Sequence, residues 1–269
     1  MFLKLIYKIS INFSTMEIRR YIRQIMIIGE EGQEKLSKAK VLVVGAGGLG
    51  SAVIAYLSAA GVGKLGIVDG DVVEEHNLQR QIIHAGNIGM NKAKSAEKFV
   101  KNLNPDVDVI SYPFNLTPSN VMEIIKEYDI VVSCPDNLTT RYLLNDACRI
   151  LGKPMVHAAI YGFEGEAMTI VDTPCYRCVY PEAMTYSEQI PVMGFTAGFF
   201  GCIQCAETIK LILGKKDILK GKILRVDLST MEWMEIKVTT NPNCPICNGK
   251  LKNIYPENYE KKCRIVKFD

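Results

Sequence analysis

The chain has 269 residues, of which 48% are hydrophobic and 23% charged, so it can bury one large core, or a core with an appendage. Its net charge of +3 comes from dispersed Lys and Arg, which argues against nucleic acid as the principal partner. A long uncharged run, residues 189–206, is interrupted by Pro191 and three glycines. It predicts a buried helix approached by a loop, so we also expect no membrane partner.

Residues 1–16 are mildly basic and apolar, but they lack the long apolar core and the small-residue cleavage site of a secretory signal. We expect them to be a leader outside the functional domain. The stretch that follows, up to residue 39, has the polar and apolar periodicity of helices leading into a first strand.

From Lys40 onward strands and helices alternate regularly. The pattern predicts strands at 40–44, 64–69, 107–111, 129–133 and 154–158, helices at 48–61, 91–103, 118–127 and 138–151, and a polar loop at 70–88. This order is typical of an α/β fold with a doubly wound, Rossmann-like and mostly parallel sheet. Strand-like pieces at 166–171 and 222–238 predict an antiparallel C-terminal extension.

A glycine-rich turn joins the first predicted strand to the first helix. Gly45, Gly47 and Gly50 form a G-x-G-x-x-G motif, which lets the chain turn sharply and lets phosphates approach the helix N-terminus. Asp69 ends the second strand, where its carboxylate can accept hydrogen bonds from ribose hydroxyls. A nucleotide is therefore the expected ligand, although any doubly wound domain with a glycine-rich first turn remains an alternative.

A polar cluster follows this second strand. Arg80 and Lys92 can bring positive charge to phosphates held over the glycine turn. Asn77, Gln79 and Gln81 can add neutral hydrogen-bond donors. A solvated loop and helix start is the alternative interpretation.

The sequence C-P-D-N, ending in Asp136 and Asn137, follows the strand at 129–133. Ligands of open α/β sheets bind at this carboxyl end of the strands. Asp136 could therefore hold Mg²⁺ against a triphosphate, because this ion prefers one or two carboxylates together with phosphate oxygens. Alternatively, or in addition, Asp136 could cap the following helix.

Two C-x-x-C pairs predict a structural zinc site formed by Cys175, Cys178, Cys244 and Cys247. Thiolates are the ligands that zinc favours in closed tetrahedral sites, and a two-residue spacer lets both sulfurs of a pair reach one ion. Two redox pairs are the alternative, but neither pair follows a thioredoxin-like βαβ start.

The chain has nine cysteines, and the other five lie mostly in apolar segments: Cys134, Cys148, Cys202, Cys205 and Cys263. We expect them to be free buried thiols, as in a reducing cytoplasm. Cys202 and Cys205 form a third C-x-x-C, but inside a helical stretch and without a partner pair, so we predict a core role for both.

A series of motifs in order and in register resembles the ThiF/MoeB/HesA family, the bacterial relatives of ubiquitin-activating enzymes. The motifs are R-Y-I-R-Q, G-A-G-G-L-G-S, D-G-D, N-L-Q-R-Q, G-M-N-K, C-P-D-N, Y-G-F-E-G and the two C-x-x-C pairs. The resemblance covers about residues 17–249, which it implies to be the adenylation domain with its zinc knuckle, and leaves residues 250–269 as a C-terminal tail.

The resemblance implies an adenylyltransferase that uses ATP, Mg²⁺ and Zn²⁺. ATP would lie over Gly48, with its ribose on Asp69 and Mg²⁺ on Asp136. The residues expected around the nucleotide are Gly45, Gly47, Gly48, Gly50, Asp69, Asn77, Gln79, Arg80, Gln81, Lys92, Asp136 and Asn137. The substrate would be a small ubiquitin-like sulfur carrier whose C-terminal Gly-Gly carboxylate attacks the α-phosphate and releases pyrophosphate. Family members are homodimers in which the arginine matching Arg23 reaches the neighbouring subunit's site.

The chain departs from the family at one point. Many relatives carry a cysteine in the loop after the first zinc knuckle, whereas residues 180–194 contain none here. We therefore expect activation without covalent transfer on that loop, with the adenylate passing to a separate sulfurtransferase. The thiamin and molybdopterin pathways both remain open, and a nicotinamide-dependent oxidoreductase and a non-catalytic nucleotide-binding scaffold remain alternative functions.

Overall fold

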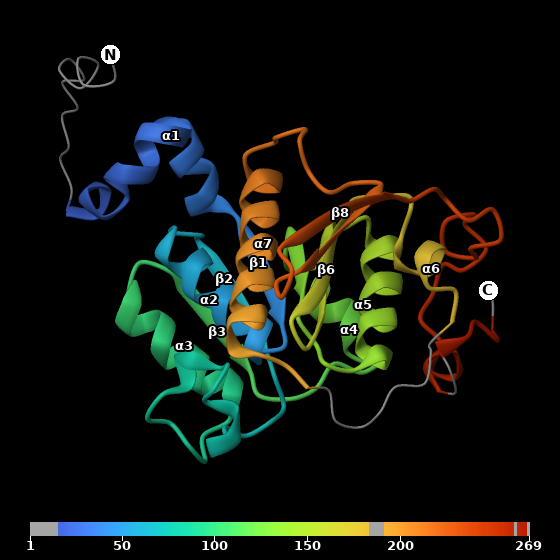
Figure 1. Ribbon diagram of the computed structural model, residues 1–269, viewed down its shortest axis with the longest axis horizontal. Coiled ribbons are helices and arrows are strands. Elements are labelled where there is room, and N and C mark those ends of the chain that lie inside the picture. Colours follow the sequence, from blue (N-terminus) through green and yellow to red (C-terminus); the bar gives the residue numbers. More distant parts are fainter. Residues whose placement is uncertain (1–15, 183–190, 261–262, 268–269) are drawn as a thin grey trace.

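A computed structural model describes residues 16–182, 191–260 and 263–267. The predicted leader, apart from Met16, and the middle of the cysteine-free loop lie outside these ranges. The described chain contains one eight-stranded sheet with the order β3-β2-β1-β4-β5-β6-β7-β8 (Figure 1). The first five strands in this order are parallel, and β6, β7 and β8 extend the sheet in antiparallel fashion. The predicted doubly wound sheet with an antiparallel extension is confirmed.

The strands are β1 (Lys40–Val44), β2 (Lys64–Val68), β3 (Asp108–Tyr112), β4 (Ile130–Ser133), β5 (Met155–Tyr161), β6 (Glu164–Ile170), β7 (Lys222–Asp227) and β8 (Glu232–Lys237). The α-helices are α1 (Met16–Lys38), α2 (Gly48–Ala59), α3 (Lys92–Leu103), α4 (Val121–Ile125), α5 (Leu138–Leu151), α6 (Tyr176–Val179) and α7 (Gly194–Ile212). Three short 3₁₀ turns are η1 (Glu75–Asn77), η2 (Ile82–His84) and η3 (Pro256–Tyr259).

Two predicted elements differ from the structure. The helix expected at 118–127 is only α4, because the Asn120 side chain accepts a hydrogen bond from the Thr117 amide and closes a turn before it. The expected polar loop at 70–88 contains η1 and η2. The Asn120 turn and η1 are closed by short-range side-chain contacts, which hydrophobic periodicity does not report.

Helices cover both faces of the sheet. One core joins α2, α3 and α7 to one face, with residues such as Val53, Val100 and Phe200 packed against Val41 and Val43. The other core joins α4 and α5 to the opposite face. The strands between the two cores are buried and rich in β-branched residues, as is typical of a parallel sheet covered on both faces.

Helix α1 precedes the sheet and is kinked at Gly29, which has a φ of 73°. It packs near the C-terminal end of α2. There the Tyr21 hydroxyl accepts a hydrogen bond from Asn104 at 2.7 Å, and Gln24 donates one to the carbonyl of Ala60 at 2.8 Å. These contacts fix α1 at the end of α2 that is farthest from the glycine turn.

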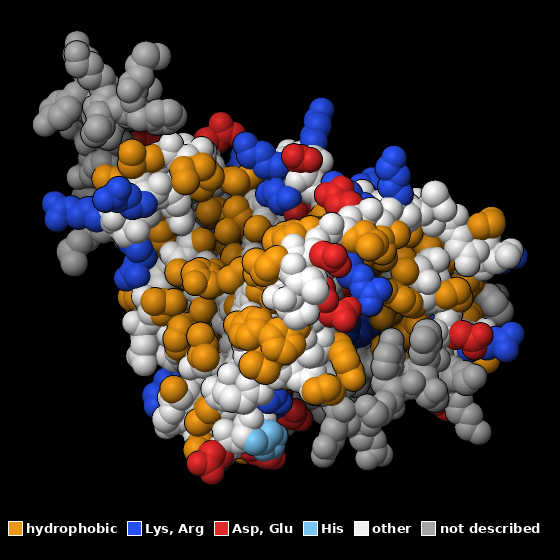
Figure 2. Space-filling model, viewed as in Figure 1, with side chains coloured by type: hydrophobic (Ala, Val, Ile, Leu, Met, Phe, Trp, Pro, Cys, Tyr) orange, Lys and Arg blue, Asp and Glu red, His pale blue; other side chains and the backbone are white. Residues whose placement is uncertain are grey.

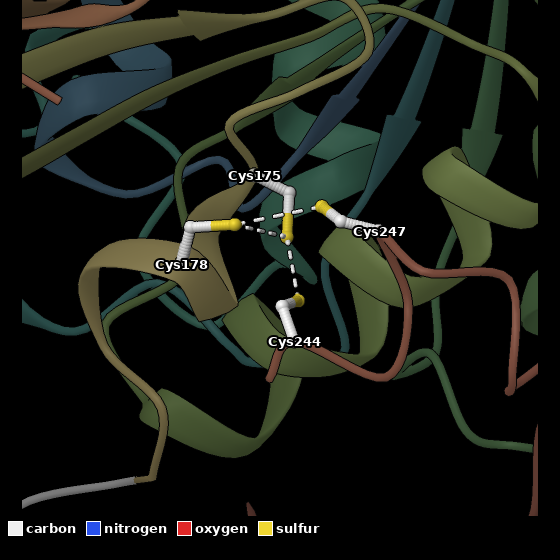
Figure 3. Close-up of side chains that lie close together, drawn as sticks. All are labelled: Cys175, Cys178, Cys244 and Cys247. Carbon is white, nitrogen blue, oxygen red and sulfur yellow. Dashed lines mark hydrogen bonds between the residues drawn. The ribbon is translucent and has the colours of Figure 1, made fainter. Parts of the chain in front are cut away.

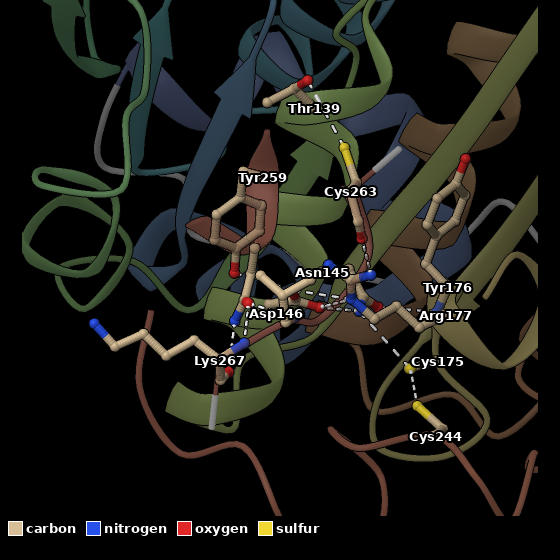
Figure 4. Close-up of polar contacts among 12 residues, drawn as sticks. Thr139, Asn145, Asp146, Cys175, Tyr176, Arg177, Cys244, Tyr259, Cys263 and Lys267 are labelled. Atoms are coloured by element: carbon tan, nitrogen blue, oxygen red, sulfur yellow. Dashed lines mark hydrogen bonds and ion pairs between the residues drawn. The ribbon is translucent and has the colours of Figure 1, made fainter. Parts of the chain in front are cut away.

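The C-terminal residues expected to form a tail pack against the second core. Tyr259 and Cys263 are buried there. The Tyr259 hydroxyl donates a hydrogen bond to the carboxylate of Asp146 in α5 at 3.0 Å, and Arg177 donates one to the Cys263 carbonyl (Figure 4). These hydrogen bonds connect the region after residue 249 to α5 and to Arg177, which lies between the two cysteines of the first pair.

Residues 194–206 of the uncharged run lie in α7, which is buried along one side and carries Glu207 and Lys210 further along. No helix among the residues that the structure describes is long and apolar enough to cross a membrane.

We predict that Tyr259→Phe lowers the free energy of unfolding by about 1.5 kcal/mol, because the buried Asp146 carboxylate loses one of its donors. Urea unfolding measures this change. Tyr161→Phe is the matched control, since Tyr161 is 60% exposed, and it should change the free energy by less than about 0.5 kcal/mol. Equal effects of the two substitutions would show that the C-terminal segment is not anchored by this contact.

Candidate functional site

The turn between β1 and α2 is pressed against the end of β4. Gly45 has a φ of +95°, and a Cβ there would lie 2.5 Å from the Cys134 carbonyl oxygen. A Cβ at Gly50 would lie 2.0 Å from the Gly45 carbonyl oxygen. Only glycine fits at either position. Gly45 brings the turn into backbone contact with the end of β4, and Gly50 brings the start of α2 against the turn itself.

The first turn of α2 presents unpaired N–H groups. The first backbone bond of the helix runs from Ser51 N–H to the Gly47 carbonyl at 2.9 Å, and none of the described residues accepts from the N–H groups of Gly48, Leu49 or Gly50. These groups and the helix dipole favour an anion at this position.

Asp69 at the end of β2 is fixed by two backbone donors. One carboxylate oxygen accepts from Ala46 N–H at 2.8 Å and the other from Asp71 N–H at 2.9 Å. Burial raises the pKa of Asp69, and the two N–H donors and Lys92 partly offset that effect. Each oxygen retains acceptor capacity, so Asp69 can both hold the turn and accept hydrogen bonds from a ribose.

The loop after β2 reaches the turn through Arg80 and Gln81. The aliphatic part of Arg80 lies about 3.5 Å from the Cβ position of Gly48. Gln81 is buried, its Nε2 lies 3.7 Å from the Cβ position of Gly47, and its Oε1 has no partner among the described residues. A buried amide oxygen without a partner, beside unpaired N–H groups, marks an incomplete polar site.

Two other predicted residues of this loop serve its own structure. The Asn77 side chain is buried and accepts from Glu74 N–H at 3.0 Å, as part of a capping box that closes η1. Gln79 is exposed, and its carbonyl oxygen lies 2.2 Å from the Cβ position of Gly194 at the start of α7. The structure therefore places both residues beside the site, with their side-chain amide donors still available.

Lys92 at the start of α3 is only 7% exposed. Its ammonium group pairs with Asp71 at 2.9 Å, and the side chain of Asp71 is 60% exposed. Asn91 caps α3 and also donates hydrogen bonds to the carbonyls of Asp69 and Asp71, which ties α3 to the end of β2. The ion pair was not anticipated from the sequence, although the D-G-D motif contains Asp71.

Asp136 follows β4 directly and is exposed, with no hydrogen-bond or ion-pair partner among the described residues. The helix cap that we considered for Asp136 belongs to its neighbour. Asn137 is the N-cap residue of α5 and accepts from Thr140 N–H at 2.9 Å. Capping by Asp136 was therefore wrong, and its carboxylate is free for other contacts.

A hollow of about 490 Å³ opens beside these residues. The residues around it come from the turn, the loop and the start of α7, and they include Gly48, Ser51, Gln79, Arg80, Ile82, Met193, Gly194 and Phe195. Its size lies within the range of small-molecule sites. The hydroxyl of Ser51 is buried without a partner on the same side of α2.

Arg23 is exposed on α1 and is not brought to this cluster within the chain. Its neighbours Tyr21 and Gln24 contact the C-terminal ends of α3 and α2. Helix α2 has 12 residues, so its two ends are about 18 Å apart. That separation is longer than an arginine side chain can span.

His84 is a residue of the site that the sequence analysis missed. It is fully buried in η2, and its Nε2 lies 2.7 Å from the carbonyl oxygen of Ala46 in the glycine turn. The only signal in the sequence was its position three residues after Gln81. A single histidine in an apolar run gives no indication of this contact.

The four cysteines of the two C-x-x-C pairs converge at one point (Figure 3). Their sulfur atoms all lie within 4.8 Å of one another, with Cys175 3.6 Å from Cys244 and Cys178 3.5 Å from Cys247. Four sulfurs bound tetrahedrally to one zinc ion are roughly 3.8 Å apart. The cluster thus has the donors and the spacing of a tetrahedral metal site.

Polar groups from α5 support the first pair (Figure 4). Asn145 accepts from Tyr176 N–H at 2.9 Å and lies 3.8 Å from the Cys175 sulfur. The guanidinium of Arg177, between the two cysteines, donates to the carboxylate of Asp146 at 2.7–3.0 Å. Such contacts fix the orientation of metal ligands.

The core prediction for the remaining cysteines holds for four of them: Cys134, Cys148, Cys205 and Cys263. Cys202 is exposed, so its predicted core role was wrong. It lies on the outward side of α7 in helical register with Phe195 and Ala206, which are also exposed, whereas Cys205 faces the sheet. Because α7 is apolar on both sides, the sequence does not indicate which of its two cysteines faces the sheet.

Comparison with known proteins identifies the family of the chain. The model of the ThiF family matches residues 21–246. The chain belongs to the ThiF family. This match runs from within α1 to Ile246, next to the last cysteine of the second pair, and it includes the turn, the loop and Asp136.

Relatives of this ThiF family chain cover nearly its whole length. It is 44% identical over 266 residues to the SAMP-activating enzyme E1 of Haloferax volcanii, covering 95% of this chain and 98% of that protein. It is 40% identical over 264 residues to the sulfur carrier protein adenylyltransferase of Thermus thermophilus, covering 93% and 97%. It is also 39% identical to the adenylyltransferase and sulfurtransferase MOCS3 of Xenopus laevis, covering 92% of this chain but 57% of that protein.

Solved structures agree with the fold of this ThiF family chain. Escherichia coli MccB in complex with MccA superimposes with a TM-score of 0.77 at 21% identity, covering 87% of this chain and 75% of that chain. The structure of MccB with ATP gives a TM-score of 0.75 at 21% identity, covering 85% and 74%. The likeness is one of fold.

Proposed function

We propose that this chain is an ATP-dependent adenylyltransferase that activates the C-terminal glycine carboxylate of a ubiquitin-like sulfur-carrier protein, of the thiamin or molybdopterin type. The observation that carries the proposal is the set of unpaired N–H groups at the start of α2, with Arg80 beside Gly48. Asp136 follows the end of β4 that contacts the turn through the Cys134 carbonyl, and Asn91 ties the helix of Lys92 to the end of β2. Membership of the ThiF family and the names of its two near full-length relatives support the same chemistry.

ATP is the proposed nucleotide. Its ribose would be held by Asp69, and its phosphates by the N–H groups after Gly47 together with Arg80, Gln81 and Lys92. The names of the relatives and the MccB structure with ATP support this assignment. An NAD-dependent dehydrogenase would also use the glycine turn and Asp69, but it would leave Arg80, Lys92 and Asp136 without a role.

In the proposed reaction, a carboxylate oxygen of the carrier's last glycine attacks the α-phosphorus of ATP. The bond from that phosphorus to the bridging oxygen of the β-phosphate breaks, and pyrophosphate leaves with the electron pair. The product is an acyl-adenylate. Two anions must approach each other, so positioning and positive charge from Arg80 and Lys92 stabilise the transition state without a general base.

Asp136 is the proposed magnesium ligand. It is exposed, has no hydrogen-bond or ion-pair partner among the described residues, and follows β4 at the switch point between β1 and β4. Magnesium is commonly held by one or two carboxylates together with phosphate oxygens, and it would neutralise charge on those oxygens.

A separate sulfurtransferase would receive the adenylate. The segment 180–194 has no cysteine, and burial raises the pKa of Cys134 to about 12, so that thiol is a poor nucleophile. Cys202 is exposed, so mass spectrometry of carrier adducts on this residue is the direct check of this part of the proposal.

A homodimer with shared sites is also proposed. Figure 2 shows hydrophobic side chains gathered over α1, α2 and α7. Exposed members are Met26 and Ile27 on α1, Tyr56 on α2 and Phe195 on α7. An apolar surface of this kind is typical of an interface between subunits. A second copy covering it could supply the arginine that the chain cannot bring to its own site.

We propose zinc as the metal of the four-cysteine cluster. All four donors are thiols, two of them are fully buried, and Asn145 supports one of them, as in structural zinc sites. The ion would connect α6 to the segment after β8, far along the chain, and would close a long loop away from the glycine turn.

We predict that Asp136→Ala reduces carrier-dependent ATP–pyrophosphate exchange by at least about hundredfold through loss of magnesium. The thermal midpoint should not change, because Asp136 caps no helix. Isotope exchange and thermal unfolding measure the two effects.

The matched variant for this test is Asn137→Ala. It removes the helix cap and should lower the free energy of unfolding by about 1 kcal/mol. Exchange that persists in Asp136→Ala would contradict the magnesium assignment. A fall in stability equal to that of Asn137→Ala would contradict the assignment of the cap.

We predict complementation between Arg23→Ala and Asp136→Ala. Each variant should be inactive alone. If the site is shared, a mixed dimer contains one site with both defects and one with neither, so exchange activity should partly return after subunit exchange. If Arg23 acts within its own chain, every site keeps one defect. No recovery in a sample shown to contain heterodimers would overturn the shared site.

We predict that the purified protein contains about one zinc ion per chain, and that Cys244→Ser loses it and lowers the melting temperature by roughly 10 °C or more. Affinity for ATP should change much less. Cys202→Ser is the control and should keep both zinc and stability, because Cys202 is exposed. Less than about half an equivalent of zinc in protein purified without chelator would contradict the site.

A further inference from the structure

Ala46, the central residue of the G-x-G turn, is held through both of its backbone groups. Its N–H group donates to the carboxylate of Asp69 at 2.8 Å. Its carbonyl oxygen lies 2.7 Å from Nε2 of His84. The residue between the two glycines thus has both backbone groups fixed by side chains from other elements.

The hydrogen bonds define the tautomer of His84. A carbonyl oxygen only accepts, so Nε2 must carry the proton that bonds Ala46. Nδ1 then carries no proton and accepts a hydrogen bond from the Ser95 hydroxyl, whose oxygen lies 2.9 Å away. The Ser95 oxygen in turn accepts from the side-chain amide of Asn87 at 3.1 Å. The hydrogen bonds thus run in one direction, from Asn87 through Ser95 and His84 to Ala46 in the glycine turn.

The imidazole is neutral in this arrangement. His84 is fully buried, and burial, together with the charge of Lys92, lowers its pKa. A neutral ring with a fixed tautomer keeps its acceptor for Ser95 and its donor for Ala46. Its orientation is therefore determined by both nitrogen atoms.

The same contacts join the two segments that carry the cations. His84 lies in η2, which directly follows Arg80 and Gln81. Ser95 lies in the first turn of α3, three residues after Lys92. A shift of η2 or α3 would move the carbonyl of Ala46, and with it the N–H groups that follow. Hydrogen-bond donors must be oriented before the charge develops if they are to stabilise a transition state.

We propose that His84 is a positioning residue for nucleotide binding, which holds the Ala46 peptide so that the N–H groups of the glycine turn face the phosphates. This inference rests on the proposed function for its ligand. His84 itself contacts no substrate; it acts through the backbone of the turn.

Two substitutions of His84 distinguish the roles of its two ring nitrogens. The amide nitrogen of glutamine falls near the position of Nε2, and that of asparagine near Nδ1. His84→Gln can therefore still donate to Ala46, whereas His84→Asn leaves that buried carbonyl without its donor. Both variants replace the ring by an amide in the same cavity, so each controls for the stability change of the other.

The test compares the binding of ATP with Mg²⁺ and the amide hydrogen exchange of residues 45–50 in the wild type and both variants. His84→Asn should bind ATP about tenfold more weakly and should exchange the Ala46 amide at least several times faster. His84→Gln should restore most of both properties, while the melting temperatures of the two variants remain similar.

Wild-type affinity in His84→Asn, or equal weakening in both variants, would overturn the positioning role. If the wild type binds no ATP, the proposed function fails, and amide exchange alone decides whether His84 holds the turn. Faster exchange in His84→Asn, reversed in His84→Gln, supports the contact, and unchanged exchange refutes it.

Discussion

The backbone contact between the β1–α2 turn and the end of β4 is the constraint on which the site depends. It forms because Gly45 has no side chain, so the Cys134 carbonyl can lie against the turn, while Gly50 lets the first turn of α2 lie against the Gly45 carbonyl. Strands β1 and β4 are neighbours in the sheet but distant in sequence, which makes this the switch point of the topology. Asp136 lies two residues after Cys134, directly beyond this contact with the glycine turn. Any side chain at Gly45 would separate the proposed magnesium ligand from the proposed phosphate site.

Around that contact the charged groups are held in position before any ligand is present. Lys92 is buried against Asp71, and Asp69 is fixed by two backbone donors. The energetic cost of ordering these side chains is therefore met in folding and not on binding. The cysteine cluster lies on the other face of the sheet with α5 and the C-terminal segment, and α5 begins two residues after Asp136.

The sequence predicted most of the fold because strand and helix periodicity alternate without interruption from β1 to β5. It also predicted the cysteine cluster, because the spacing within each C-x-x-C pair limits the geometry to one ion. It did not predict which of two adjacent polar residues caps α5, because Asp and Asn are equally good N-caps and only the backbone angles decide. It missed the roles of His84 and Asp71, because each depends on a partner far away in the chain. It misplaced Cys202, because both sides of α7 are apolar.

The most direct test of the account is mass spectrometry of a small protein ending in Gly-Gly after incubation with this chain, ATP and Mg²⁺, quenched in acid. The account predicts an adenylate on the carboxylate of the last glycine, with pyrophosphate formed in equal amount. The adduct should be absent when the last glycine is deleted and when Asp136→Ala replaces the wild type. A carrier that stays unmodified while the chain binds it and hydrolyses ATP would contradict the adenylation of the carrier.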